Sequence, residues 1–172
     1  MAVSTKKRAE TLVKKDSTGK LRQELYANAY RRIQKSIVDG YPLEGIALLD
    51  SIITDRIEAY LTKIYNRREM AFLTLDKALK ILKEDKRTVA LVLGSGSIPV
   101  KIHQGYIGII SDLENFRNAR NQSLHEFMKV EEGKFKSWND RLDDAKKAVQ
   151  IGNALYKNVD SLFRKFTRHT LK

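Results

Sequence analysis

Three polar residues, Arg120, Asn121 and His125, lie within six positions of one another in the sequence. Histidine is the side chain best suited to exchange protons near neutral pH. Arginine offers a planar, permanently charged guanidinium that matches the oxygens of a phosphate. On a helix with about 100° per residue, Arg120 and His125 are turned about 140° apart, so one chain cannot aim both squarely at one atom. The spacing therefore fits a site that a second copy completes.

On the same projection Arg120 falls in the middle of an apolar arc. A guanidinium on such a face is costly unless it is paired or faces something charged. Two interpretations remain open. In one, Arg120 is buried and satisfied by a carboxylate, for which Asp50 on the preceding hydrophobic helix is the candidate. In the other, Arg120, Asn121 and His125 line an anion site at an interface. The arc itself consists of Ile109, Leu113, Phe116, Leu124 and Phe127.

The six residues Arg120-Asn121-Gln122-Ser123-Leu124-His125 resemble the signature of the HEPN family, in which an Arg and a polar residue, often Asn, precede a His. The context is similar too, because the segment falls in a late helix of a small helical protein, after a hydrophobic helix and before another long one. The same spacing recurs from Arg164 to His169 without the Asn. We interpret that second copy as coincidence, as short motifs often are.

The resemblance implies a metal-independent endoribonuclease that needs no cofactor and works as a homodimer. His125 would move protons at the ribose 2′-hydroxyl and the leaving 5′-oxygen, Arg120 would neutralise charge on the phosphoryl oxygens, and Asn121 would orient one of them. The products would be a 2′,3′-cyclic phosphate and a 5′-hydroxyl, and the role would be that of a toxin or phage-defence effector. Arg117 and Lys129 are the expected RNA-backbone contacts.

Two alternatives stay beside the nuclease: a non-catalytic dimeric module of the same fold that binds nucleotide, RNA or a partner protein, and a basic helical bundle in which the motif is accidental. One departure from the family bears on regulation. HEPN toxins controlled by nucleotidyltransferases commonly carry a Tyr two residues after the His, and here that residue is Phe127. Regulation by adenylylation at this position is therefore not expected.

Charge points to a polyanionic partner. The chain of 172 residues has a net charge of +12, of which residues 1–20 contribute +4 and residues 21–172 the other +8. Such a body attracts nucleic acid, and an antitoxin or another acidic protein would serve equally well. The absence of cysteine excludes disulfides and thiol chemistry. No apolar run approaches the roughly 20 residues of a membrane span, and no secretory signal is visible, so we expect a cytoplasmic protein without membrane contact.

Hydrophobic periodicity predicts an all-α protein, a four- or five-helix up-and-down bundle of HEPN-like type. Residues 1–20 are expected to be a basic flexible segment ending in a breaker cluster at 16–19, and residues 21–172 the helical domain. The expected helices cover 21–38, 42–65, 75–84 and 104–130, followed by a long one that opens at Ser137 and runs antiparallel to its neighbours.

Side-chain patterns add detail to these helices. The helix at 42–65 is apolar almost all round in its first half, which predicts a central position. Ser137 and Asp140 have the spacing of a capping box. Leu21 and Leu25 are expected on the inward stripe of the first helix and Trp138 on that of the last, while Tyr41 is expected at the edge of the core. Residues 87–105 fit either a strand or a helical turn followed by a Gly-Ser linker.

Overall fold

The computed structural model describes residues 15–65, 73–84, 100–128 and 136–170 of the chain. These residues form helices and short connections and contain no strand, which confirms the all-α expectation. Of the ambiguous stretch at 87–105, residues 87–99 lie outside the described residues, and residues 100–105 belong to the helix that begins at Val100. The helices are α1 (Lys15–Val38), α2 (Pro42–Tyr65), α3 (Leu75–Glu84), α5 (Val100–Met128) and α6 (Trp138–Thr170).

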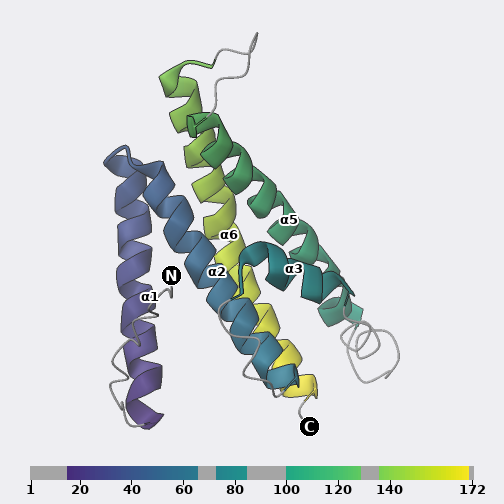
Figure 1. Ribbon diagram of the computed structural model, residues 1–172. Coiled ribbons are helices and arrows are strands. Elements are labelled where there is room, and N and C mark those ends of the chain that lie inside the picture. Colours follow the sequence, from purple (N-terminus) through teal and green to yellow (C-terminus); the bar gives the residue numbers. More distant parts are fainter. Residues whose placement is uncertain (1–14, 66–72, 85–99, 129–135, 171–172) are drawn as a thin grey trace, which may run out of the picture.

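α2 lies at the centre of the bundle, as its apolar character predicts. It packs against α1, α3, α5 and α6, with the most extensive contact to α6. Figure 1 shows α1 and α2 antiparallel and the short α3 lying across the gap between α2 and α5. The expectation that the last helix runs antiparallel to its neighbours holds against α5, whereas α2, its main partner, runs parallel to it (Figure 1).

The turn between α1 and α2 follows from local sequence. Gly40 has a φ of 80°, the left-handed conformation that glycine adopts without steric cost. The backbone N–H of Tyr41 donates to the carbonyl of Ser36 over 2.7 Å, which closes α1 in a Schellman-type end. Pro42 then opens α2 at the position where its missing N–H costs nothing.

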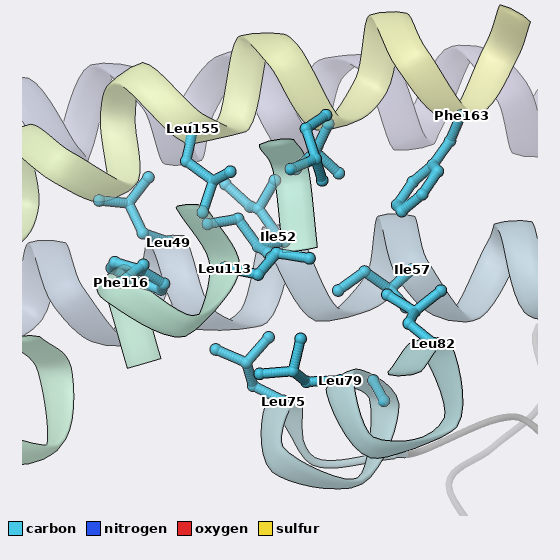
Figure 2. Packing of buried hydrophobic residues seen from close by; sticks show 14 of the residues in the cluster. Leu49, Ile52, Ile57, Leu75, Leu79, Leu82, Leu113, Phe116, Leu155 and Phe163 are labelled. Carbon is cyan, nitrogen blue, oxygen red and sulfur yellow. The ribbon is translucent and has the colours of Figure 1, made fainter. Parts of the chain in front are cut away.

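The core fills the space between α2, α3, α5 and α6. Figure 2 shows Leu49 of α2 beside Phe116 of α5 and Ile57 of α2 beside Leu82, one of the three leucines of α3 that close the lower side. Those leucines, Leu75, Leu79 and Leu82, are buried as predicted. α6 approaches closely at Gly152, where an added Cβ would lie 2.5 Å from Cε2 of Phe116.

Several helix faces differ from the expectation. Leu21 and Leu25 are 45% and 58% exposed, whereas their neighbours Arg22 and Tyr26 contact Asp55, so the two leucines lie outside the face of α1 that meets α2. Trp138 is 62% exposed at the start of α6, so it does not join the inward stripe. α1 also begins at Lys15 and includes residues 16–19, which are therefore helical rather than a break.

Within the described ranges, no helix combines the length and the apolar character that crossing a bilayer requires.

Candidate functional site

Arg120 lies buried where α2, α3 and α5 meet, and its side chain is 10% exposed. All three guanidinium nitrogens donate hydrogen bonds. Nη1 donates to Asp50 of α2, and Nη2 donates over 3.0 Å to Oδ2 of Asp76 in the first turn of α3. Nε donates to Oδ1 of Asn121 over 3.1 Å. Arg120 therefore ties three helices together.

The pairing with Asp50 confirms the first interpretation of Arg120, that of a buried arginine satisfied by a carboxylate. The second carboxylate, Asp76, was not foreseen from the sequence. Nε of Arg117 lies 3.7 Å from Oδ1 of Asp76, so two guanidiniums converge on that carboxylate. Asp76 is 52% exposed and Asp50 32%. The two arginines and two aspartates balance in charge.

His125 lies apart from this cluster. Its side chain is exposed on α5, whereas Asn121 is half-buried and accepts hydrogen bonds from Arg120. The structure thus brings Arg120 and Asn121 together and leaves His125 at the surface. This separation agrees with the roughly 140° expected from their spacing. Leu124, expected inside the apolar arc, is 44% exposed beside it.

The two expected RNA contacts have different outcomes. Arg117 is on α5, 32% exposed, and donates to Oδ1 of its neighbour Asn118 as well as approaching Asp76. Lys129 lies outside the described residues. Of the two expected contacts, Arg117 therefore lies next to Arg120 and is partly exposed to solvent.

A cavity of about 490 Å³ opens beside Arg120, between α2 and the start of α3. Four carboxylates and one guanidinium contribute to its wall, and three of those carboxylates are paired with Arg120, Arg117 or Arg22. Its polar lining includes Asp50, Thr54, Asp55, Glu58, Asp76 and Arg120. The sequence carried a signal for it that was missed: Asp50, Thr54 and Glu58 recur at every fourth residue and so form a polar stripe on α2.

The side of this cavity nearest α1 is fixed by a polar cluster. The hydroxyl of Tyr26 donates to Asp55, and the guanidinium carbon of Arg56 lies 4.3 Å from the centre of the Tyr26 ring. Burial, followed by the hydrogen bond to Asp55, raises the pKa of Tyr26 well above its usual range. The phenol therefore remains a hydrogen-bond donor to Asp55 at all physiological pH values.

A second hollow, of about 420 Å³, lies between the α1–α2 turn and the junction of α5 with α6. Phe127 and Trp138 meet there edge to face, with ring centres 5.0 Å apart. Tyr41 is 64% exposed at its rim and so is not a residue of the core edge. No spacing in the sequence indicates that these aromatic rings share one exposed groove.

No metal centre forms among residues 15–65, 73–84, 100–128 and 136–170, where no three His, Asp or Glu side chains are placed to hold an ion. No family model, no curated protein and no solved structure matches this chain.

Proposed function

We propose that the chain is a metal-independent endoribonuclease of HEPN type that acts as a homodimer. The observation that carries the proposal is the exposed imidazole of His125 on the same helix as a firmly held Arg120. An exposed imidazole is accessible to RNA and to the imidazole of a second copy. An arginine that is held in place offers a phosphate group a fixed binding position relative to that imidazole. The net charge of +12 favours a polyanionic substrate.

In the proposed reaction, His125 of one copy takes the proton of a ribose 2′-hydroxyl. The 2′-oxygen then attacks phosphorus, the bond from phosphorus to the 5′-oxygen breaks, and His125 of the other copy protonates the leaving oxygen. The products are a 2′,3′-cyclic phosphate and a 5′-hydroxyl. Two histidines are needed because one must be neutral and the other protonated at the same moment.

Arg120 can contact the phosphate of the substrate only if it gives up one of its two carboxylate partners. A phosphate oxygen would have to replace Asp76, the more exposed of its two carboxylates, while Asp50 continues to hold the side chain. Arg117 would be released by the same exchange, since it approaches Asp76 too. Two guanidiniums one helical turn apart would then be available to the charge that grows on the phosphoryl oxygens.

A second candidate function is a non-catalytic dimeric module with the same surface. The specific observation in its favour is that Asp50 and Asp76 already neutralise Arg120. Such a protein would bind RNA through its basic surface without cleaving it.

Cleavage of a mixed RNA substrate in the presence of EDTA separates the two functions. For a nuclease we expect wild-type activity and a loss of about a hundredfold or more in His125→Ala, the range for removing a general acid–base group. Because His125 is exposed, this variant should fold normally. His169→Ala is the matched control, since His169 has the same spacing from an arginine. Cleavage products should carry 2′,3′-cyclic phosphate ends.

RNA binding without cleavage would instead support the non-catalytic module. Equal cleavage by wild type and His125→Ala would contradict the proposed site and point to a contaminating nuclease. The oligomeric state gives an independent check, because a strictly monomeric protein at micromolar concentration could not form the shared site. Light scattering coupled to gel filtration measures it directly.

A further inference from the structure

A groove of about 590 Å³ runs between α5 and α6, which lie side by side and antiparallel (Figure 1). Its volume falls in the range of about 300–1,000 Å³ that small-molecule sites occupy. Four carboxamide side chains line it, although the whole chain has only eight Asn and five Gln residues. This amide groove is defined by Asn115, Asn118 and Gln122 of α5 and Asn158 of α6.

The charge of the amide groove differs from that of the protein as a whole. Among its described lining residues Asp112 is the one ionised side chain and no Lys or Arg occurs, in a chain of net charge +12. A phosphate group is not attracted to such a lining, because it would face a carboxylate and no cation. Carboxamides offer both N–H donors and a carbonyl acceptor. The lining therefore favours an uncharged polar ligand that has donors and acceptors of its own.

Two of the amides are oriented by their neighbours on α5. Oδ1 of Asn118 accepts hydrogen bonds from Nε and Nη2 of Arg117, over 3.3 and 3.0 Å, so its N–H groups remain for a ligand. Nε2 of Gln122 donates to Oε1 of Glu126 over 2.8 Å, which leaves the carbonyl oxygen of Gln122 as an acceptor. One turn of α5 thus presents a donor and an acceptor. The Watson–Crick edge of an unpaired base supplies the complementary groups.

Apolar side chains complete the lining of the amide groove. Ala119 of α5 and Ile151 and Leu155 of α6 belong to it, and Ile151 is 39% exposed. Proteins commonly hold a single-stranded base by packing against its flat face while they bind its edge through hydrogen bonds. A base in a duplex cannot be bound in this way, because its edge is already paired and its faces are stacked.

The amide groove lies on the same face of α5 as His125. Asn118, Gln122 and His125 follow one another at intervals of four and three residues, which places their side chains along one side of a helix. Along the helix axis, Gln122 precedes His125 by about 4.5 Å and Asn118 precedes it by about 10.5 Å. All three side chains are exposed. A base in the groove would therefore be close to a phosphate on which His125 acts.

We propose that the amide groove binds an unpaired base of the RNA and so determines which nucleotide lies next to the cleaved bond. This inference rests on the proposed function, since the position beside His125 is what favours RNA over another uncharged polar ligand. It makes single-stranded RNA the substrate class, and it assigns the base preference to Gln122 and Asn158.

The test is binding of a fluorescent 2′-O-methyl oligonucleotide to the full chain, measured by anisotropy. This probe has no 2′-hydroxyl to attack, so binding is measured without cleavage. We expect the single strand to bind about tenfold or more tightly than an abasic strand of equal length and charge, because the abasic strand keeps only the backbone contacts.

Gln122→Leu and Asn158→Leu should each lower the affinity for the single strand about threefold to tenfold, as for the loss of one hydrogen-bonding group. Gln34→Leu, the same substitution at an exposed amide of α1, is the matched control and should bind like wild type. Both groove residues are exposed, so the variants should fold. Thermal unfolding close to that of wild type would show that a loss of affinity is not a loss of structure.

Two results would overturn the proposed groove and assign RNA binding to the basic surface alone: equal binding of the abasic strand, or an equal loss in Gln34→Leu. Cleavage whose base preference is unchanged in Gln122→Leu and Asn158→Leu would also overturn it, while the proposed nuclease would stand. Base-dependent binding without any cleavage of ordinary RNA would have the opposite meaning, because it would support the groove and contradict the nuclease.

Discussion

Nη2 of Arg120 donates over 3.0 Å to Oδ2 of Asp76, so that a buried guanidinium of α5 is held by a half-exposed carboxylate at the start of α3. The other carboxylate, Asp50, lies on the central helix and is less exposed. The two aspartates thus have different positions in one ion-pair cluster. Their different burial leads to different expected energetic contributions.

Neutralising Asp50 should destabilise the protein more than neutralising Asp76. We expect Asp50→Asn to lower the free energy of unfolding by about 1.5–3 kcal/mol, as for a hydrogen bond to a charged group in a shielded position. Asp76→Asn should cost at most about 1 kcal/mol, because solvent screens its half-exposed side chain. Urea unfolding measures both, and equal losses would show that Arg120 does not depend on Asp50 in particular.

If the proposed nuclease is correct, Asp76→Asn should increase RNA binding. The substitution removes the charge that competes with phosphate for Arg117 and Arg120. We expect roughly a threefold to tenfold gain in affinity at low salt, with tenfold corresponding to about 1.4 kcal/mol. The gain should shrink as salt screens the charges. Glu84→Gln, an exposed neutralisation at the other end of α3, is the control and should have no such effect.

Gly152 should not tolerate a larger side chain. A Cβ there would lie 2.5 Å from Cε2 of Phe116, whose ring is fully buried and cannot move away. We expect Gly152→Ala to destabilise the fold by about 1–3 kcal/mol through overpacking. Gly108→Ala is the control, since a Cβ there meets nothing within 4 Å. That variant should gain about 0.5–1 kcal/mol from helix propensity, and a loss in both variants would contradict the steric explanation.

The N-terminus of α6 should depend on Ser137. Its hydroxyl accepts the N–H of Asp140 over 3.1 Å, and the carboxylate of Asp140 accepts the N–H of Ser137 over 3.3 Å. Ser137→Ala should cost about 1 kcal/mol, the usual value for a lost N-cap. Ser161→Ala, at an exposed position inside α6, should be neutral or slightly stabilising. Thermal unfolding distinguishes them.

Acid should weaken the junction of α5 with α6. Hydrogen bonds from Lys136 are the main cause that lowers the pKa of Glu126 from its ordinary 4.5 and that of Asp144 from 3.8. Because both folded-state pKa values lie below the unfolded ones, their contribution is present above the unfolded values and is lost as the pH falls through the folded ones. We expect unfolding temperatures to drop below about pH 4.5. Lys136→Met should flatten this part of the profile, and an unchanged profile would contradict the assignment.

Local rules predicted the helices well. Pro42 and the Ser137–Asp140 pair fix the starts of two helices through contacts within a few residues, and α2 and α3 have the expected bounds. Coverage of a helix face is different, because it depends on the side on which a neighbouring helix packs. Leu21 and Trp138 follow the apolar period and are still exposed, although Arg22 beside Leu21 pairs with Asp55 of α2 and Trp138 meets Phe127 edge to face.

The candidate site was predictable in part for the same reason. The sequence pattern makes Asp50 the candidate partner of Arg120, because both residues project onto the apolar faces of long helices. Asp76 is on a short helix 44 residues away from Arg120, and its approach depends on how α3 lies across the bundle. The cavity beside Arg120 depends on the same placement of α3. The residue pattern of α2 therefore predicts only the part of the cavity wall that α2 supplies.

The main contact of α2 is with α6, although more than 70 residues separate the two in the chain. During synthesis α2 emerges long before its principal partner, so the face of α2 that packs on α6 stays uncovered until the last helix has been made. Contacts of such large sequence separation also slow folding, because a long loop has to close first. A nascent chain of this protein should therefore depend on chaperones that bind exposed apolar helices. The chain should leave these chaperones after α6 has been completed.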